Sequence, residues 1–405
     1  MRLVRVRKTK EQGRVRLGAQ MEEENGVIHG APFFEFPEAW ADDIASAPDP
    51  FIPPLLIAAM RAGVPLRVDL PVSERLCKRI PEQQAILQSL HPRELKTVPF
   101  HAAAGFRPPH PAASGIGAFF SLGVDSFHTL LRHEPAHTGD AEAAPCTHLI
   151  YIVGFENPLD DFTDGRDEAV AAEVHAVAEH WRKSAVCVRT NLRHCLDVPW
   201  ARQLHGPVLA AIGLALSGRC GTVRVPASYT WRALQPWGSH PVLDPLWSTD
   251  EVEIVHDGAE VDRARKIADT VVRSPFARSR LRVCTKQGGG AGNCGACGKC
   301  LRTMTTLEIT GALGDSPCFP VRRLPRSFWR HLRLKSRGDV DFSEENRRLA
   351  EAYEAPPWIR KGLRRAILMG EYEIIRKQHG NRGFIAGLMH FVGSKTFSRW
   401  FFKRG

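Results

Sequence analysis

The chain has 405 residues, of which 43% are hydrophobic and 24% are charged, a composition typical of a globular protein with a large buried core. It holds no run of about 18 apolar residues, and no apolar stretch follows the basic N-terminal MRLVRVRKTK, so neither a membrane-spanning helix nor a secretory signal is expected and a cytoplasmic protein is expected by default. The net charge of +11 is concentrated near the C-terminus: residues 321–405 hold 20 Lys and Arg against 8 Asp and Glu.

Residues 1–112 are expected to form an N-terminal α+β domain. RLVRVRKTK and GRVRLGAQ alternate polar and apolar residues, which predicts a pair of strands. PFIPPLLIAAMRAG predicts a buried helix that ends at Gly63, and PVSERLCKRIPEQQAILQSL predicts one or two helices with an interruption near Pro81. The proline-rich FRPPHPAASG then marks a domain boundary near residue 112.

Residues 113–318 alternate between apolar strands and helices. GIGAFF, THLIYIVGF, SAVCVRTNL, GTVRVPASY and RLRVC are the expected strands, and helices are expected at 126–133, 166–183, 206–218 and 262–272. Such alternation favours an α/β fold with a mostly parallel, doubly wound sheet and helices on both faces.

The segment FFSLGVDSFHTLLR, residues 119–132, predicts a phosphate-binding turn between a strand and a helix. Backbone N–H groups and the positive end of the helix dipole converge on such a turn, and Gly123 lets an anion approach the backbone. Ser121 and Ser126 can donate hydroxyl groups, whereas Asp125 can hold Mg²⁺ or cap the helix. An ordinary capped turn is the alternative, and the G-K-[ST] ending of a Walker loop is absent.

This segment resembles the S-G-G-x-D-S signature of the PP-loop, or N-type, ATP pyrophosphatases. The match places Ser121, Gly123, Asp125 and Ser126 on the signature, and Leu122 stands where the family usually has its first glycine. A leucine there still donates its N–H group unless the position needs a positive φ. The resemblance implies that ATP binds at Ser121, Leu122, Gly123, Val124, Asp125, Ser126 and Gly154, with catalytic roles for Asp125 and Ser126.

Four clustered cysteines predict a metal site. Cys284 is followed nine residues later by C-x-x-C-x-x-C, which adds Cys294, Cys297 and Cys300, and four thiolates on a glycine-rich turn suit a structural tetrahedral Zn²⁺. A redox cysteine pair, an iron–sulfur cluster and unliganded thiols are the alternatives. A PP-loop followed by this knuckle is similar to the 7-cyano-7-deazaguanine synthase family of queuosine biosynthesis over about residues 115–310.

The long segment after the fourth expected strand, residues 225–247, predicts a substrate wall. Ligands of open parallel sheets bind at the carboxyl ends of the strands, where aromatic side chains can stack on a flat heterocycle and polar groups can read its edge. The candidate residues are Ser228, Tyr229, Trp237, Ser239, His240 and Asp244. The alternative is a loop whose tryptophans belong to the core. By the same argument Gly154, Arg189, Thr190 and Asn191 line an adenosine pocket or simply end their strands.

The C-terminal region, residues 319–405, mixes basic and aromatic residues and predicts helices. Residues 385–392 have near-helical apolar spacing, so this region can contact RNA, an anionic membrane or a protein partner, or can pack on the main domain.

The resemblance implies a ligase that uses ATP and Mg²⁺ to adenylate a small-molecule carboxylate. Release of AMP and pyrophosphate would accompany addition of ammonia or another amine and formation of an amide or nitrile, and the substrate is expected to be a 7-deazapurine. Two alternatives remain open from the sequence. One is an RNA-thiolation enzyme using Cys187 or Cys195, and the other is a non-catalytic nucleotide-binding module in which Leu122 marks a degenerate loop.

Overall fold

The computed structural model describes residues 1–22, 26–156, 159, 166–284 and 292–379. Contacts divide the chain into two compact units, Met1–Glu260 and Val261–Gly405, which are described separately. The domain boundaries expected near residues 112 and 318 remain predictions.

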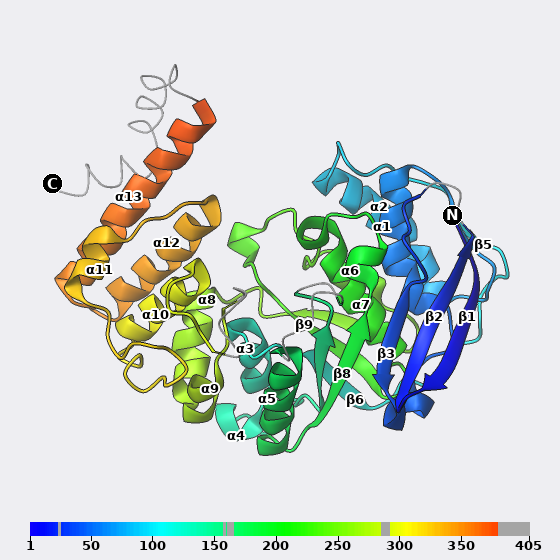
Figure 1. Cartoon of the computed structure of the whole chain (residues 1–405), viewed down its shortest axis with the longest axis horizontal. Helices are drawn as coiled ribbons and strands as arrows, with labels where there is room; N and C mark the ends of the chain where they lie inside the picture. The colour runs from blue at the N-terminus through cyan, green and yellow to red at the C-terminus, as the bar shows by residue number, and fades with distance from the viewer. Residues whose placement is uncertain (23–25, 157–158, 160–165, 285–291, 380–405) are drawn as a thin grey trace. The chain divides into compact units, whose positions relative to one another are not determined.

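The first unit is an α/β structure built on one ten-stranded sheet with the order β10-β9-β6-β7-β8-β3-β2-β1-β4-β5 (Figure 1). The strands are β1 (Arg2–Glu11), β2 (Arg14–Glu22), β3 (Phe33–Pro37), β4 (Leu66–Val68), β5 (Phe100–Ala102), β6 (Gly115–Phe119), β7 (His148–Val153), β8 (Ser184–Thr190), β9 (Cys220–Pro226) and β10 (Glu253–Asp257). Most ladders are parallel, and the antiparallel ones join β8 to β3, β3 to β2 and β2 to β1.

The strands β6 to β10 form a parallel half-sheet whose order reverses between β6 and β9. In such a doubly wound sheet the point of reversal opens a crevice at the carboxyl ends of the strands. Five of the six residues of β7 are buried, as expected for a strand covered by helices on both faces. This arrangement confirms the expected mostly parallel α/β sheet.

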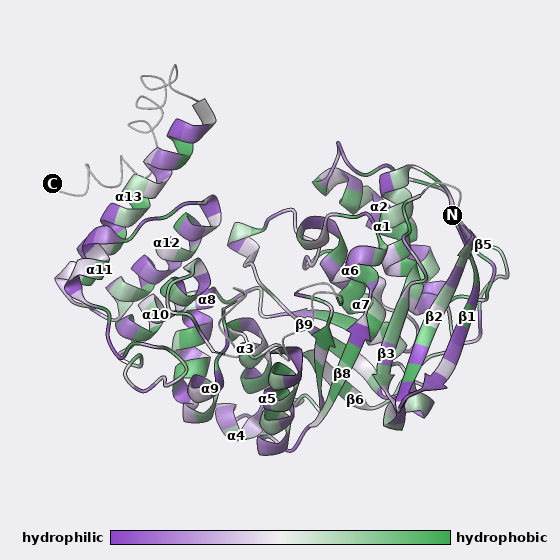
Figure 2. Ribbon diagram, in the orientation of Figure 1, coloured by the Kyte–Doolittle hydropathy of each residue, from purple (hydrophilic) through white to green (hydrophobic). Residues whose placement is uncertain are grey.

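Helices cover both faces of this half-sheet. They are α3 (Val124–Arg132), α4 (Pro135–Thr138), α5 (Arg166–His180), α6 (Leu192–Cys195) and α7 (His205–Ala215), with a π-helical turn at Trp200–Leu204. The crossovers through α3 and α5 run in one direction along the sheet and the one through α7 runs back, so right-handed connections place α7 on the opposite face (Figure 1). Hydrophobic residues dominate the strands between these layers (Figure 2).

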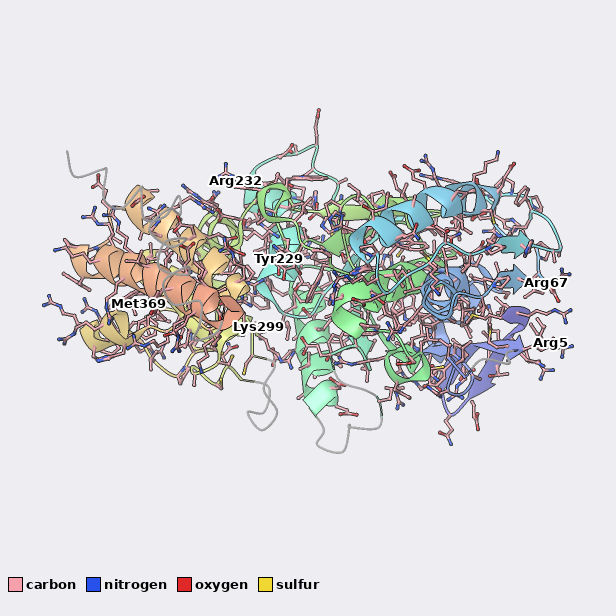
Figure 3. All side chains as sticks on the ribbon, turned by 90° about the horizontal axis from the view of Figure 1, so that it is seen from above. Arg5, Arg67, Tyr229, Arg232, Lys299 and Met369 are labelled. Carbon is pink, nitrogen blue, oxygen red and sulfur yellow. The ribbon has the colours of Figure 1, made fainter. Side chains whose placement is uncertain are left out.

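The N-terminal strands extend the same sheet, because Phe34 and Glu35 of β3 pair with Thr190 and Arg189 of β8. Figure 3 shows Arg5 of β1 and Arg67 of β4 at this end of the sheet. The helix α1 (Ile52–Ala62) is buried along most of its length and packs on α7, and it ends at Gly63 with φ +69° as the sequence indicates.

The helix α2 (Glu74–Leu90) continues through Pro81, so the predicted interruption does not occur. Ser73 caps its N-terminus by accepting a hydrogen bond from the N–H group of Leu76. Packing of the buried face that includes Ile80 and Leu87 outweighs the hydrogen bond that proline removes.

Two further expectations are wrong in detail. Residues 281–284 lack regular secondary structure although a strand was expected at 280–284, and the edge strand is instead β10, which has polar residues at both ends. The helix expected at 262–272 is broken into α8 (Arg263–Arg265), a π-helical turn at Lys266–Thr270 and a 3₁₀ turn at Val271–Arg273.

The second unit is helical over its described residues. It contains α8, α9 (Pro275–Arg280), α10 (Gly298–Ile309), α11 (Arg326–His331), α12 (Arg337–Ala352) and α13 (Pro357–His379). The helix α12 packs against both α10 and α13. The predicted amphipathic stretch at 385–392 lies outside the described residues. Among the described helices of both units, none has the length and apolarity needed to cross a membrane.

Candidate functional site

The predicted phosphate loop joins β6 to α3 at the crevice where the strand order reverses. The strand ends at Phe119, the N–H group of Phe120 donates to the carbonyl of Ile150 on β7 at 2.8 Å, and α3 begins at Val124 with Gly123 as its N-cap. The first N–H groups of a helix have no carbonyl partner within that helix, and those of α3 lie at the carboxyl end of β6. The loop thus has the placement that an anion cradle requires.

Leu122 has a left-handed backbone conformation, with φ +62°. This is the position at which the PP-loop signature usually has glycine. A left-handed leucine costs roughly 1–2 kcal/mol relative to the ordinary helical conformation. The side chain of Leu122 is 2% exposed, and burial of an isobutyl group offsets a cost of this size. The loop therefore has the backbone conformation typical of glycine but is anchored by a buried leucine side chain.

The hydroxyl group of Ser126 braces this loop from inside. It accepts a hydrogen bond from the N–H group of Ser121 at 3.3 Å and donates to the carbonyl of Gly123 at 3.0 Å. Ser126 is buried, whereas Ser121 is exposed and Asp125 is half-buried at the start of α3. The phosphate-binding roles predicted for these residues, and for Leu122, Gly123 and Val124, remain predictions.

Asp257, at the end of β10, anchors α3 to the sheet. Its carboxylate accepts a hydrogen bond from the hydroxyl of Thr129 at 2.6 Å and lies 2.8 Å from Nε2 of His133. Burial alone would raise the pKa of Asp257, but hydrogen bonds from His133 and Thr129 and the charges of His133 and Arg132 outweigh it and lower that pKa to about 2. The helix that carries the loop is thus tied to the edge strand by a buried carboxylate.

Gly154 follows β7 with φ +89°. A Cβ atom there would lie 2.3 Å from the carbonyl oxygen of Thr190, so no other residue fits without backbone movement. Two of the neighbours considered for an adenosine pocket hold β8 to β3: Thr190 donates to the carbonyl of Phe33, and the side chain of Asn191 bonds to the backbone of Phe33 and Ala31. ATP contact at Gly154 remains a prediction.

Aromatic residues of the expected substrate wall lie together after the carboxyl ends of the strands. The ring centroids of Tyr229 and Trp237 are 5.6 Å apart in an edge-to-face contact, and Trp237 makes a similar contact with His205 at the start of α7. Phe155, just beyond β7, makes edge-to-face contacts with both His205 and Trp200, so the five rings form one continuous cluster. The sequence indicated Tyr229 and Trp237 but not the other three rings, whose segments lie far away in the sequence.

His205 is tightly packed within this aromatic cluster. Burial lowers the pKa of its imidazole to about 4, so the ring is neutral near pH 7. The loop approaches closely here, since a Cβ atom on Gly206 would lie 2.0 Å from the carbonyl oxygen of Gly238. The aromatic wall is therefore held against the first turn of α7.

The polar candidates of the wall converge on the carboxylate of Asp244. Ser239 donates its hydroxyl to Asp244 at 2.6 Å, the N–H group of His240 donates at 3.1 Å, and Nδ1 of His256 on β10 lies 2.7 Å away. Asp244 is 1% exposed and His240 is buried, with its pKa lowered by burial, whereas Ser228 is exposed. In this structure Asp244 fastens the loop to β10, and substrate contact by these residues remains a prediction.

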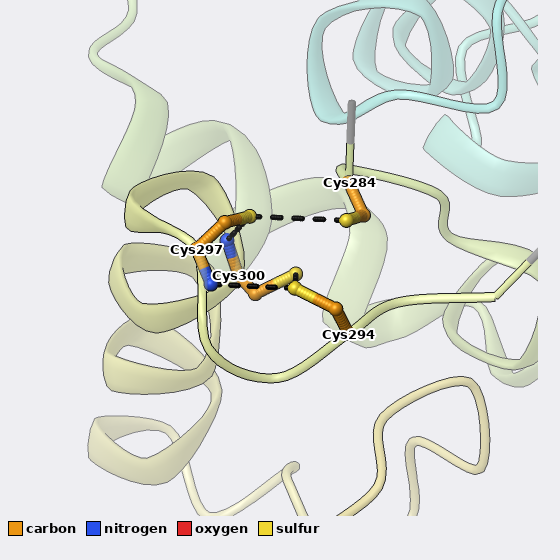
Figure 4. Close-up of side chains that lie close together, drawn as sticks. All are labelled: Cys284, Cys294, Cys297 and Cys300. Carbon is orange, nitrogen blue, oxygen red and sulfur yellow. Dashed lines mark hydrogen bonds between the residues drawn. The ribbon is translucent and has the colours of Figure 1, made fainter. Parts of the chain in front are cut away.

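The second unit holds the four clustered cysteines. Their sulfur atoms all lie within 4.8 Å of one another, and Figure 4 shows them facing a common centre. The Sγ atoms of Cys294 and Cys300 are 3.9 Å apart, as are those of Cys284 and Cys297. A tetrahedron with metal–sulfur bonds of about 2.3 Å has sulfur–sulfur edges of about 3.8 Å. The four residues therefore fit a metal ion such as zinc.

Backbone N–H groups prepare these sulfur atoms to carry negative charge. The N–H groups of Ala296 and Cys297 donate to Sγ of Cys294 and lower the pKa of Cys294 to about 6. The N–H group of Cys300 likewise donates to Sγ of Cys297, the N-cap of α10. Burial raises the pKa of Cys300 in the metal-free protein, and a bound cation reverses that effect. Four sulfur ligands leave no open coordination position for catalysis.

Asn293 positions the irregular segment that carries Cys284. Its side-chain oxygen accepts hydrogen bonds from the N–H groups of Val283 and Cys284, and its amide group donates to the carbonyls of Leu281 and Cys318. These bonds replace the strand ladder that the sequence predicted there. Asn293 was not identified from the sequence, although it directly precedes the first cysteine of the C-x-x-C-x-x-C run.

The two cysteines considered for thiolation are not activated. Burial raises the pKa of Cys187 to about 11, with Nε2 of His175 3.7 Å from its sulfur atom. Cys195 is buried and its thiol donates to the carbonyl of Gly30. A nucleophilic thiol needs an accessible thiolate, so this geometry gives no support to the thiolation alternative.

Comparison with models of known protein families, with curated proteins and with solved structures finds no match to this chain.

Proposed function

We propose that the chain is an ATP-dependent ligase that transfers AMP to a carboxylate and then passes the activated acyl group to ammonia or another amine. The reaction would be similar to that of 7-cyano-7-deazaguanine synthase. The observation that carries the proposal is the left-handed Leu122 in a strand-to-helix loop at the reversal of the sheet order. Backbone conformations that a residue type rarely adopts are enriched at functional sites.

The residues of the β6–α3 loop and of the aromatic wall would have separate roles in this reaction. Ser121, Gly123 and the first N–H groups of α3 would bind the departing pyrophosphate, and Ser126 would keep the loop closed around it. Asp125 would hold Mg²⁺, which would partly neutralise the negative charge of the phosphates. The aromatic wall of Tyr229 and Trp237 would orient a flat heterocyclic acid such as a 7-deazapurine carboxylate.

Adenylation solves a specific chemical problem, because a carboxylate cannot lose oxide. One carboxylate oxygen attacks the α-phosphorus of ATP and pyrophosphate leaves, which gives an acyl adenylate. The amine then attacks the acyl carbon, loses a proton, and AMP departs with the oxygen that came from the carboxylate. Formation of a nitrile requires a further activation of the amide oxygen and its removal.

We further propose that the metal of the four-cysteine cluster is zinc and that its role is structural. The sulfur–sulfur distances support this assignment, and the saturated sulfur ligation gives the ion no place in the adenylation chemistry.

The transfer of oxygen to AMP provides the test of the reaction class. The full chain is incubated with ATP, Mg²⁺, ammonium and candidate acids labelled with oxygen-18 in the carboxyl group, 7-carboxy-7-deazaguanine among them. Mass spectrometry of the nucleotide is expected to show AMP carrying one labelled oxygen, and the product to be the amide or nitrile. Asp125→Asn is expected to abolish the labelled AMP, whereas the exposed Asp42→Asn changes the charge equally and retains activity.

Unlabelled AMP, or ADP with inorganic phosphate, would contradict adenylation of a carboxylate. ATP binding without any AMP would identify the non-catalytic nucleotide-binding module. AMP formed only with tRNA and sulfide would identify RNA thiolation.

A further inference from the structure

The second unit carries an exposed stretch of positive charge that the proposed ligase reaction does not use. Residues 322–337 contain seven Lys and Arg and no Asp or Glu. The short helix α11 lies within this stretch and packs on α13. Figure 2 shows hydrophilic residues along α13, and Figure 3 shows nitrogen-tipped side chains extending from it.

Close packing joins the exposed sides of the two helices into one surface. Trp329 of α11 is buried against Gly362 of α13, where a Cβ atom would lie 2.7 Å from the tryptophan. The guanidinium group of Arg326 lies 4.3 Å from the ring centroid of Trp358, and Arg365 donates to the backbone carbonyl of Arg330. We call the exposed set the α11–α13 surface: Arg326, Arg330, Trp358, Lys361 and Arg365.

The positive charges of this surface are not neutralised within the described structure. Trp358, Lys361 and Arg365 occupy one face of α13 by their spacing, and no ion pair among the described residues involves the basic members of the surface. Glu351, the acidic residue nearest to α13 in the preceding helix, pairs with Arg347 and Arg364. Beyond Glu373 the sequence contains no acidic residue at all, so the remaining chain adds only positive charge. Clustered like charges repel one another, and an anionic ligand would relieve that repulsion.

The apolar residues of α13 indicate which polyanion fits. Ile359, Leu363, Ala366 and Ile367 are buried within the unit, and Met369 is the large aliphatic side chain exposed on the described part of α13. A helix that inserts into a lipid interface needs a broad exposed apolar face. Trp358 is 37% exposed and already stacked by an arginine, an arrangement that also suits an unpaired base.

We propose that the α11–α13 surface binds single-stranded nucleic acid, with Arg326, Arg330, Lys361 and Arg365 on the phosphates and Trp358 against a base. Recognition through phosphates and one stacking platform is insensitive to sequence. This binding does not depend on the proposed ligase activity, and its test requires no ATP.

The test measures binding of the full chain to fluorescently labelled RNA and DNA single strands of more than about 16 nucleotides, at salt concentrations between about 50 and 200 mM. The logarithm of the association constant is expected to fall linearly with the logarithm of the salt concentration. Arg326→Gln/Arg330→Gln/Lys361→Gln is expected to weaken binding at least tenfold and to reduce the slope by about 2, since each lost phosphate contact on a single strand removes about 0.7. Arg365 is left unchanged because it bonds to α11.

The matched control is Lys78→Gln/Arg79→Gln/Arg182→Gln, which removes the same charge from exposed positions in the first unit and is expected to bind as the wild type does. Trp358→Ala is expected to weaken binding several-fold without changing the slope, because stacking releases no counterions. Equal losses in the two triple variants would overturn the proposal, as would tighter binding to phosphatidylglycerol vesicles than to nucleic acid, or no binding in low salt. A preference between RNA and DNA would identify the strand type.

Discussion

Leu122 combines two properties that usually exclude each other, a buried aliphatic side chain and a left-handed backbone. At the level of the sequence a leucine in this position indicates only that a glycine is missing and that an N–H group remains. The structure shows that Leu122 nevertheless has a backbone conformation that glycine adopts readily, since φ is +62°. No sequence pattern predicts this, because leucine is rarely found at positive φ. The backbone strain at Leu122 is tolerated because burial of its side chain offsets the cost.

Asp257 gives a prediction about stability and pH. Its folded pKa of about 2 lies below the ordinary value of 3.8, so the ionised form is stabilised by folding. That contribution is complete above about pH 4 and is lost as the pH falls toward 2, and it amounts to about 2 kcal/mol. Asp257→Asn is therefore expected to lower the melting temperature near neutral pH, and the difference from the wild type is expected to narrow on acidification.

Melting curves of both proteins between pH 7 and pH 3 provide the measurement. The control is Asp140→Asn in an exposed loop, which is expected to melt with the wild type throughout. A melting temperature unchanged by Asp257→Asn at neutral pH, or a difference that grows in acid, would show that the carboxylate does not anchor α3.

The wall residues show what the sequence could and could not predict about the site. Tyr229 and Trp237 belong to one loop, and their proximity follows from the strand before them. His256 was missed because it lies on β10, a strand that was not predicted because both of its ends are polar. His205 was missed because its aromatic contact with Trp237 joins two separate segments and has no sequence signal. The role of Asp244 as the centre of hydrogen bonds depends on those unseen partners.

Among the elements, the strands β6, β7, β8 and β9 were predicted because each is an apolar run bounded by helices. The strand expected at 280–284 was wrong for a physical reason: the N–H groups of Val283 and Cys284 donate to the side chain of Asn293, so no ladder forms. Leu281 and Val283 are nevertheless buried there without a strand ladder.

The cysteine knuckle gives the prediction at this scale. We expect the purified chain to carry about one Zn²⁺, and we expect a strong chelator to lower the melting temperature of the second unit because metal binding contributes to folding. Cys297→Ser removes a sulfur ligand, although serine can still cap the N-terminus of α10, and it is expected to lose the metal. Elemental analysis together with melting curves tests both expectations.

The control is Cys187→Ser, a cysteine outside the cluster, which is expected to retain zinc and stability. If the purified chain instead carries iron at the four cysteines, the site holds an iron–sulfur cluster and not zinc. If the chain contains no metal and neither Cys297→Ser nor Cys187→Ser changes its melting temperature, the assignment of a metal site is contradicted.

The whole molecule differs from the expected arrangement mainly at its N-terminus. Residues 107–113 of the proline-rich connector were predicted correctly as irregular, yet Arg107 pairs with Asp49 and Glu251 and connects the N-terminal residues to the segment before β10. The pairing of β3 with β8 then makes one sheet from two expected parts. Neither contact could be predicted, because each joins residues more than 50 positions apart without a local pattern.

The proposed function depends on whether the loop between β6 and α3 binds ATP, and one binding experiment tests that directly. Calorimetric titration with α,β-methylene-ATP and Mg²⁺, which requires no knowledge of the acceptor, is applied to the wild type, Leu122→Gly and Leu122→Ile. We predict that the wild type and Leu122→Gly bind the nucleotide, because both allow a positive φ. We predict that Leu122→Ile binds at least tenfold more weakly, because a β-branched residue is not tolerated there despite its equal volume. Absence of binding to the wild type, or equal binding by all three proteins, would contradict the assignment of this loop as the nucleotide site.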